Sequence, residues 1–214
     1  TMLNAGQCEH LEILFQQGAG EASQALSQWL AHPASVRLHR IQPRSLQAAT
    51  ESLGADDQVI GMCIMQVAQG LSGQWILAFE DRAGLLLADL LLGHPPRDEG
   101  QGRWGDIERS AAMETANILA CSFLCALQKR LSASIAEGEP HSEDAWLPSP
   151  PIFVRDYAPA LMQFLLSHQA IESSQVLVAQ TQMVIEDRQV QWHWLWIPDA
   201  AGLQMATELL RETP

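Results

Sequence analysis

The chain has 214 residues, 47% of them hydrophobic, which is enough apolar material for one large domain or two small ones. The 25 Asp and Glu residues outnumber the 12 Lys and Arg residues and give a formal net charge of −13, so nucleic acids and anionic membranes are poor partners. No apolar run reaches the roughly 18 residues that a membrane helix needs, and no basic start leads into an apolar stretch, so we expect a cytoplasmic protein without membrane contact.

The first element in the chain is an amphipathic helix over residues 9–30. Its apolar residues recur at steps of three and four, and Pro33 ends it. Gly18 and Gly20 lie inside this helix, where each costs about 1 kcal/mol relative to alanine. We therefore expect another helix or backbone to pass close to both glycines.

Short strands and helices fill the rest of the first half. We expect Pro43 in the first turn of a helix, a glycine-bearing turn between two hairpin strands, and Gly93 at the end of the last helix. The predicted elements are a strand at 36–41, a helix at 44–53, strands at 58–68 and 74–79, and a helix at 82–92.

A long helix predicted over residues 104–132 carries a polar stripe. Its second half is apolar nearly all round, which is typical of a helix packed between other layers with no solvent face. Ser110, Glu114 and Asn117 are spaced i, i+4 and i+7, so a hydroxyl, a carboxylate and a carboxamide leave the helix within an arc of roughly 60°. The stripe is either the polar side of a half-exposed helix or a functional site.

The four cysteines are Cys8, Cys63, Cys121 and Cys125. None forms a Cys-x-x-Cys pair, and no histidines stand near them at the spacing of a zinc site, which fits free thiols in a reducing compartment. Cys121 and Cys125 are four residues apart on the long helix, and we predict that both are core thiols.

The second half of the chain repeats the first. Two hairpin segments recur 117 residues later, a short-helix segment recurs 118 residues later, and the long helices match at an offset of 101. A duplication explains these matches. The matched segments are Gln58-Val59 and Gln175-Val176, Gln74-Trp75 and Gln191-Trp192, Ala83-Gly84-Leu85 and Ala201-Gly202-Leu203, and Ala25-Leu26 and Ala126-Leu127.

The offsets differ because of an insertion, which we place at the polar, acidic residues 136–147. Residues 156–168 then form the helix equivalent to 44–53. We predict a single domain over residues 1–214, with the repeated halves at 9–93 and 104–210.

The last predicted hairpin contains an unusual run of tryptophans. Trp192, Trp194 and Trp196 alternate along a strand and so share one face of it. We expect them to pack against the long helices rather than to bind a ligand. His193 points to the other face, where we expect an ordinary sheet histidine rather than a metal ligand.

The polar stripe is similar to a known motif. Ser110-x-x-x-Glu114-x-x-Asn117-Ile118-Leu119 resembles the active-site helix of the CheC/CheX/FliY phosphatases of bacterial chemotaxis, whose pattern is Asp or Ser, three residues, Glu, two residues and Asn. The segment Leu147-Pro148-Ser149-Pro150-Pro151 resembles the proline-rich segment after that helix, and Gly18-Ala19-Gly20-Glu21-Ala22 resembles the family's first helix. The proline that follows the helix in the family corresponds to Pro140 or to one of Pro148 and Pro150.

The resemblance implies a fold and an activity. The fold is α/β (α+β), in which two pseudo-symmetric halves form an antiparallel sheet and two long helices pack side by side on one face. The activity is that of a phosphatase for the phosphoaspartate of a CheY-like receiver domain, with catalytic residues Glu114, Asn117 and Ser110. The protein needs no cofactor of its own, and Mg²⁺ is expected on the partner receiver domain.

The resemblance also implies a role for each of these residues. Asn117 orients the attacking water through its carboxamide, which can both donate and accept hydrogen bonds. Glu114 pairs with a lysine beside the partner's phosphorylation site, and Ser110 makes a peripheral polar contact. The first-half residues at the offset of 101 are Glu9, Ile13 and Gln16, and because Ile13 carries no charge we expect one intact site.

The alternative is a non-enzymatic adaptor of the same fold, which binds a receiver domain, a CheD-like deamidase or flagellar-switch components, as the related middle domain of FliM does. The Glu114/Asn117 pair favours the enzyme, whereas the degenerate first site and the inserted loop favour the adaptor. A homodimer is a further option. The sequence contains no Gly-x-Ser-x-Gly, Gly-x-Gly-x-x-Gly, phosphate-loop or His-Glu-x-x-His motif, so other hydrolase or dehydrogenase activities have no support.

Overall fold

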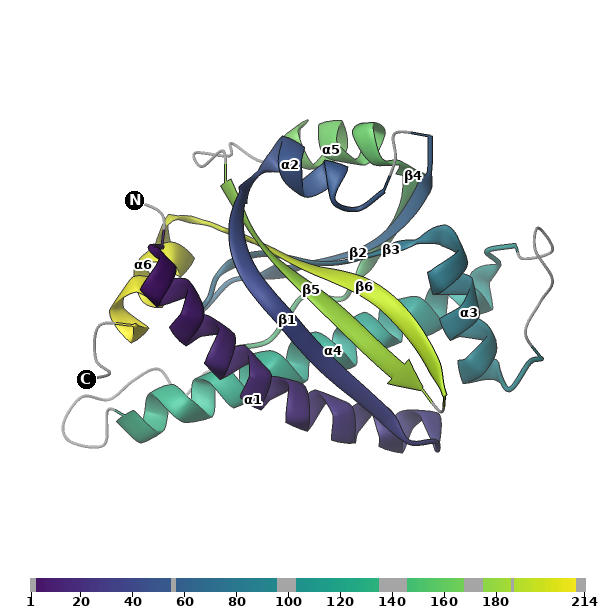
Figure 1. Ribbon diagram of the computed structural model, residues 1–214, viewed down its shortest axis with the longest axis horizontal. Helices are drawn as coiled ribbons and strands as arrows, with labels where there is room; N and C mark the ends of the chain where they lie inside the picture. Colours follow the sequence, from purple (N-terminus) through teal and green to yellow (C-terminus); the bar gives the residue numbers. More distant parts are fainter. Residues whose placement is uncertain are drawn as a thin grey trace.

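The structure is a computed structural model that describes residues 3–54, 57–95, 103–134, 146–167, 175–185 and 187–210. One antiparallel sheet of six strands runs through the molecule in the order β1-β5-β6-β3-β2-β4 (Figure 1). The elements in chain order are α1 (Ala5–Leu30), β1 (Ala34–Ser45), α2 (Leu46–Glu51), β2 (Val59–Val67), β3 (Gly73–Glu80), α3 (Asp81–Leu92), α4 (Asp106–Ser134), β4 (Ile152–Tyr157), α5 (Ala158–Ser167), β5 (Gln175–Ile185), β6 (Arg188–Pro198) and α6 (Ala200–Leu209).

The strand order reflects the internal repeat. The first half contributes β1, β2 and β3, and the second half contributes β4, β5 and β6. Exchanging each strand for its counterpart, β1 for β4, β2 for β5 and β3 for β6, gives the same order read from the other edge. The predicted fold class, two pseudo-symmetric halves that share one antiparallel sheet, is therefore confirmed.

The two long helices lie side by side on one face of the sheet, and α2 and α5 lie on the other (Figure 1). A capping box starts α1: Asn4 Oδ1 accepts from the Gln7 backbone N–H at 2.9 Å, and the Asn4 backbone N–H donates to Gln7 Oε1 at 2.9 Å. A Cβ atom on Gly18 would lie 2.9 Å from Phe123 Cδ1 of α4. The predicted close approach is confirmed at Gly18 but is wrong at Gly20, where such an atom would meet nothing within 4 Å.

Pro43 lies in β1 and pairs with Leu177, so its predicted place in a helix is wrong. The strand can hold a proline because it is an edge strand, where one side of the backbone needs no ladder partner. The helix after it begins only at Leu46, with Ser45 as N-cap. Likewise α5 begins at Ala158, because the preceding residues form the opposite edge strand, β4.

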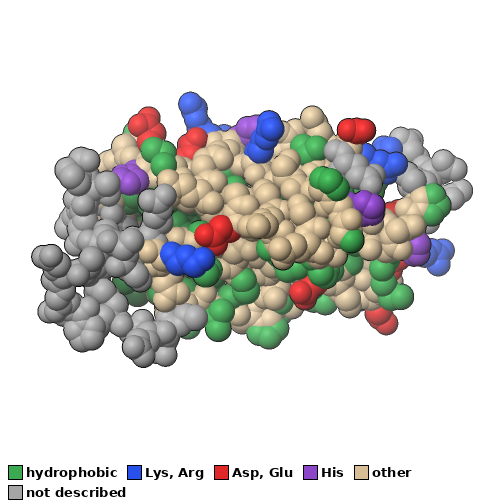
Figure 2. All heavy atoms as spheres, turned by 90° about the horizontal axis from the view of Figure 1, so that it is seen from below, with side chains coloured by type: hydrophobic (Ala, Val, Ile, Leu, Met, Phe, Trp, Pro, Cys, Tyr) green, Lys and Arg blue, Asp and Glu red, His purple; other side chains and the backbone are tan. Residues whose placement is uncertain are grey.

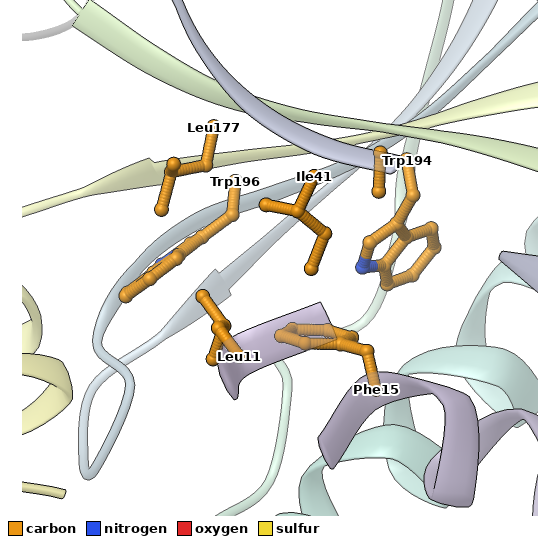
Figure 3. Close-up of a pocket in the computed structure, with 7 residues that line it drawn as sticks. Leu11, Phe15, Ile41, Leu177, Trp194 and Trp196 are labelled. Atoms are coloured by element: carbon orange, nitrogen blue, oxygen red, sulfur yellow. The ribbon is translucent and has the colours of Figure 1, made fainter. Parts of the chain in front are cut away.

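The tryptophans of β6 are buried against the long helices, as predicted. Trp194 lies 5.7 Å from Phe123 of α4 and 5.7 Å from Trp75 of β3 between ring centroids. The space left in this layer is a void of about 10 Å³ (Figure 3), roughly the volume of one water probe. This face of the sheet is therefore packed core, and it is lined there by Leu11, Phe15, Ile41, Leu177, Ala179, Trp194 and Trp196.

The α4 helix is long and apolar enough to pass as a candidate membrane helix, which the search for apolar runs in the sequence did not indicate. Within the described parts of the chain, Asp106–Lys129 is the one segment whose length and composition would suit a membrane helix. More than half of that segment is buried by the protein itself, against α1, α3 and the sheet. A core helix of a globular domain has the same composition, so the segment is weak support for a membrane span.

Candidate functional site

The predicted site residues share one exposed stripe of α4. Ser110 and Glu114 are exposed and Asn117 is half-buried, whereas neighbours such as Thr115 and Ala116 are fully buried. The stripe continues into the second half of the helix, where Cys121 is only half-buried and keeps some contact with solvent. The expectation that this half has no solvent face is wrong, because α1, α3 and the sheet leave one side of α4 uncovered.

Charged side chains are sparse over the face that carries the long helices (Figure 2). Glu114 is the charged residue in the stripe, and no described residue forms an ion pair with it. The nearby Arg109 guanidinium lies 5.9 Å from the centre of the Phe153 ring. A carboxylate with no ion-pair partner among the described residues, on a surface of this kind, can bind a cation from another molecule.

Ser110, Glu114 and Asn117 open onto a groove with a volume of about 440 Å³. One wall is α4, which also contributes Met113, and the other wall is formed by Pro148, Pro150 and Pro151. The structure therefore brings together two segments that carry the resemblance to the phosphatase family, the polar stripe of α4 and the proline-rich segment. Of the prolines left open by the sequence, Pro148 and Pro150 both line the groove, and Pro140 lies outside the described residues.

The proline wall is fixed to the end of β2. The Ser149 backbone N–H donates to the Gln66 carbonyl at 2.8 Å, and the Gln66 N–H donates to Ser149 Oγ at 2.9 Å. Two residues before Pro148, the Trp146 backbone N–H donates to Gln128 Oε1 of α4 at 3.1 Å. The Trp146 indole lies on Gly70, where a Cβ atom would be only 2.0 Å from the ring and where φ is +68°. Glycine at position 70 thus permits both the turn and the contact.

Cys121, which was predicted to be a core thiol, contacts one of the groove residues. Its thiol donates to Asn117 Oδ1 at 3.8 Å. Burial raises the pKa of Cys121 above its usual value of 9.0, and the charges of Glu114 and Cys125 raise it further. The thiol therefore stays protonated and remains a donor to Asn117. Its i+4 spacing from Asn117 was the signal that could have identified it.

Cys125 is exposed, so its assignment to the core is also wrong, while Cys8 and Cys63 are buried. Helical periodicity explains the error. Cys121 and Cys125 continue the stripe that starts at Ser110, and the described elements leave this side of α4 partly open.

The first-half equivalents of the site residues differ from them in chemistry and in contacts. Ile13 is 58% exposed and places an apolar side chain where Glu114 has its counterpart. The Gln16 carboxamide donates from Nε2 to the Leu38 carbonyl. That carbonyl borders a β-bulge in β1, and the Ile41 N–H on the other side of the bulge donates to Glu12 Oε2 at 3.4 Å. These polar side chains of α1 hold the backbone of β1.

No three His, Cys, Asp or Glu side chains within the described ranges come together in a way that could hold a metal ion. What the groove presents is a carboxylate, a carboxamide and a hydroxyl on one helix. Such a set can bind a cation of another protein and orient a water molecule.

Comparisons with known proteins identify the fold. No protein-family model matches the sequence, and no curated protein does. The structure is similar to FliY from Thermotoga maritima, with a TM-score of 0.75 and 15% identity over 100% of both chains. It is also similar to the FliM middle domain from Vibrio alginolyticus (TM-score 0.61, 14% identity, 93% of this chain and 98% of the other) and to a structure of the FliG–FliM complex from H. pylori (TM-score 0.64, 12% identity, 94% and 100%). The CheC-like fold implied by the sequence resemblance is confirmed.

Proposed function

We propose that this protein, which has the fold of FliY and of the FliM middle domain, is a phosphatase-type regulator that hydrolyses the phosphoaspartate of a CheY-like receiver domain. The observation that supports the proposal most directly is the pair Glu114 and Asn117, which opens side by side onto a groove walled by Pro148, Pro150 and Pro151. Its place is in chemotaxis or related two-component signalling, in the cytoplasm.

The chemistry requires little from the protein beyond positioning. A water oxygen attacks the phosphorus of the acyl phosphate, the bond from phosphorus to the aspartyl oxygen breaks, and the aspartate carboxylate and inorganic phosphate are released. The receiver domain supplies the leaving carboxylate and its Mg²⁺ ion, and the protein described here needs no metal of its own. What a second protein can add is a group that places the water in line with the phosphorus.

Asn117 is suited to that role. Its Oδ1 accepts a weak hydrogen bond from the Cys121 thiol, and Oδ1 has a second lone pair while Nδ2 has two hydrogens for other contacts. Glu114, one turn before it and without a described cation partner, would pair with a lysine of the receiver domain and hold the two proteins in register. Ser110 would contribute a peripheral hydrogen bond.

The proposal is tested by the lifetime of the phosphorylated state. Phosphorylated receiver domains of the host are mixed with wild type, Asn117→Ala, Glu114→Ala or the control Ser122→Ala, and phosphate release and binding are measured on the same samples. Ser122 is on the same helix but donates to the Ile118 carbonyl within it, outside the groove. We expect the control to equal wild type.

The two site variants should differ from each other. Asn117→Ala should lose about 100-fold in turnover with nearly unchanged binding, because a water-positioning contact acts mainly in the transition state. Glu114→Ala should weaken binding about tenfold and lower kcat/KM with it, because a docking contact is made before the chemistry. A wild-type protein that shortens the lifetime of no phosphorylated receiver domain would refute the phosphatase.

The second candidate function is an adaptor that binds a receiver domain, a CheD-like protein, a flagellar-switch component or a second copy of itself. Solved structures of this fold include FliM in complex with FliG and FliM in complex with SpeE, both from H. pylori. The degenerate first site, with Ile13 exposed in place of a carboxylate, favours this function. Binding of a receiver domain without any change in phosphate lifetime would support it.

A further inference from the structure

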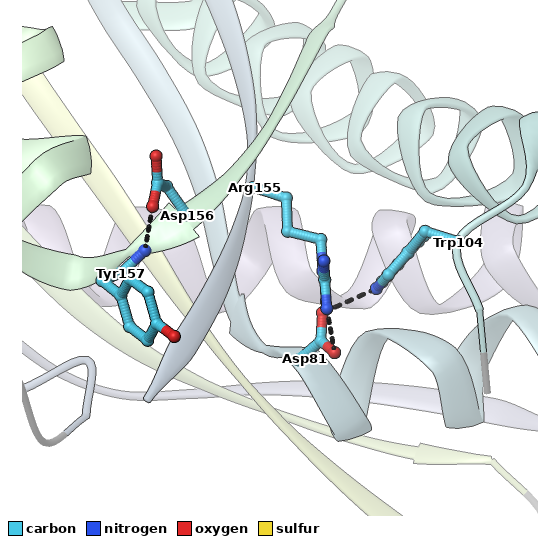
Figure 4. Close-up of polar contacts among 5 residues, drawn as sticks. All are labelled: Asp81, Trp104, Arg155, Asp156 and Tyr157. Atoms are coloured by element: carbon cyan, nitrogen blue, oxygen red, sulfur yellow. Dashed lines mark hydrogen bonds and ion pairs between the residues drawn. The ribbon is translucent and has the colours of Figure 1, made fainter. Parts of the chain in front are cut away.

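The groove has two walls that come from distant parts of the chain, and both walls lead to the same carboxylate. Trp104 lies six residues before Ser110 of the helical wall, and Arg155 lies four residues after Pro151 of the proline wall. Both residues bind Asp81, the first residue of α3 (Figure 4).

The contacts to Asp81 are short and well directed. Arg155 donates from Nε to Oδ1 at 2.5 Å and from Nη2 to Oδ2 at 2.8 Å, the two-pronged geometry that fits a guanidinium to a carboxylate. Trp104 donates from Nε1 to Oδ1 at 2.7 Å. The N-terminus of α3 favours a negative charge at this position.

Aromatic contacts support the same junction. The centroid of the Trp104 ring lies 4.8 Å from the ring centroid of Phe153 in β4 and 5.7 Å from that of Phe79 in β3. Gly84 of α3 leaves room for them, because a Cβ atom there would be 2.3 Å from Phe79 and 2.7 Å from Trp104. The start of α4 and the strand after the proline wall are therefore held together at the upstream end of the groove.

We propose that Asp81 is a positioning residue, which sets the separation of the two groove walls through Trp104 and Arg155 and so places Asn117 relative to the docked partner. The proposal deepens the proposed function and rests on it for its activity readout. The ion pair is only partly buried, with the side chains of Asp81 and Arg155 exposed by 26% and 42%, so it contributes little to global stability. Its main effect is on geometry, because two parallel hydrogen bonds fix the direction as well as the distance.

Three variants test these contacts of Asp81 with Trp104 and Arg155, which we call the brace, together with one matched control. Asp81→Asn removes the ion pair but keeps an acceptor for Trp104, Trp104→Phe removes the donor but keeps an aromatic ring, and Arg155→Lys keeps the charge without the two-pronged geometry. The control is Glu21→Gln, which breaks the 3.4 Å ion pair between Glu21 of α1 and Lys129 near the other end of α4.

Activity is measured well below the melting temperature of each variant, against a phosphorylated receiver domain. We expect kcat/KM to fall about tenfold in Asp81→Asn and about threefold in Trp104→Phe and Arg155→Lys, because a small displacement of a positioning group has effects of this order. Glu21→Gln should equal wild type. Brace variants that melt at lower temperature but keep kcat/KM within twofold of wild type would show a purely structural role and overturn the inference.

A second measurement separates this inference from the proposed function. Amide resonances of Asn117 and Ser149 report on the two walls in the protein alone, and microsecond-to-millisecond exchange at both should appear in Asp81→Asn and be absent in Glu21→Gln. If wild type is inactive but this exchange appears, the phosphatase fails and the brace stands. If wild type is active but Asp81→Asn has wild-type resonances and wild-type kcat/KM, the brace fails and the phosphatase stands.

Discussion

At the scale of single residues, the orientation of one carboxamide carries most of the proposed chemistry. Asn117 Oδ1 accepts a hydrogen bond from the thiol of Cys121, one turn further along the helix, at 3.8 Å. A thiol is a weak donor, so it can orient the carboxamide without competing strongly with a water molecule for it. The thiol also remains protonated at neutral pH, since burial and the nearby Glu114 raise its pKa.

The first prediction concerns this contact. Cys121→Ser keeps a donor at the position, so phosphate release should stay within about twofold of wild type, whereas Cys121→Ala should lower turnover by about two- to fivefold, which corresponds to the loss of one weak hydrogen bond. The measurement is phosphate release at saturating receiver domain from pH 7 to 9. Equal rates for the alanine and serine variants would show that the thiol does not orient Asn117.

At the scale of elements, the contacts of α1 show how the first half differs from the second. The α1 helix is held to the β1 bulge by Gln16 and Glu12, and it is packed on α4 at Gly18. The residue aligned with Asn117 has thus become a structural contact. The opposite edge strand, β4, follows the proline wall, and the groove lined by Ser110, Glu114 and Asn117 lies on that side.

We therefore predict that Gln16→Ala lowers the free energy of unfolding by about 1 kcal/mol, through loss of the hydrogen bond to the Leu38 carbonyl. Dephosphorylation of the receiver domain should be nearly unchanged. Urea denaturation and phosphate release on the same preparation test both parts. A loss of activity comparable to that of Asn117→Ala would mean that the first helix still participates in the chemistry.

The two glycines of α1 provide a matched pair. Gly18→Ala should lower the free energy of unfolding by about 1–3 kcal/mol, because the added methyl group would lie 2.9 Å from Phe123 Cδ1 and would push the long helices apart. Gly20→Ala should raise it by up to about 1 kcal/mol, because the added methyl group meets nothing within 4 Å and alanine favours the helix. Denaturation midpoints of both variants decide the point, and a stabilising Gly18→Ala would contradict the packing of α1 on α4.

At the scale of the whole molecule, the central strand β6 imposes a pH dependence. His193 pairs with Gln180 of β5 on one side and with Ala78 of β3 on the other, and burial lowers its pKa below 6.5. Below pH 6.5 the unfolded chain binds a proton more readily than the folded protein does. The contribution of His193 to stability is therefore lost progressively as the pH falls below about 6.5.

We predict that the free energy of unfolding of wild type falls between pH 7.5 and 5.5, and that His193→Gln, which cannot titrate, shows a smaller fall. Urea denaturation at the two pH values provides the measurement. Equal falls in the two proteins would mean that burial of His193 does not affect the pH dependence.

The domain prediction, one domain over residues 1–214 with halves at 9–93 and 104–210, stays a prediction at this scale.

Periodicity and order along the chain determined most of the architecture from sequence alone. The offset of 117 predicted equivalent hairpins, the offset of 118 predicted equivalent short helices, and the i, i+4, i+7 spacing placed Ser110, Glu114 and Asn117 on one stripe of α4. These inferences succeed because helical and strand geometry depend on local spacing. Local propensity misplaced Pro43, because only the sheet shows that β1 is an edge strand that tolerates a proline.

Only the tertiary structure decided which sides of the elements are open and which distant residues meet. Cys121 and Cys125 are as apolar as core residues, but the described elements leave their side of α4 partly open, and Cys121 contacts Asn117 there. Asp81, Trp104 and Arg155 come together from three segments with no shared spacing. Contacts of this kind depend on how the sheet brings strands together across long sequence separations, which no local pattern in the sequence encodes.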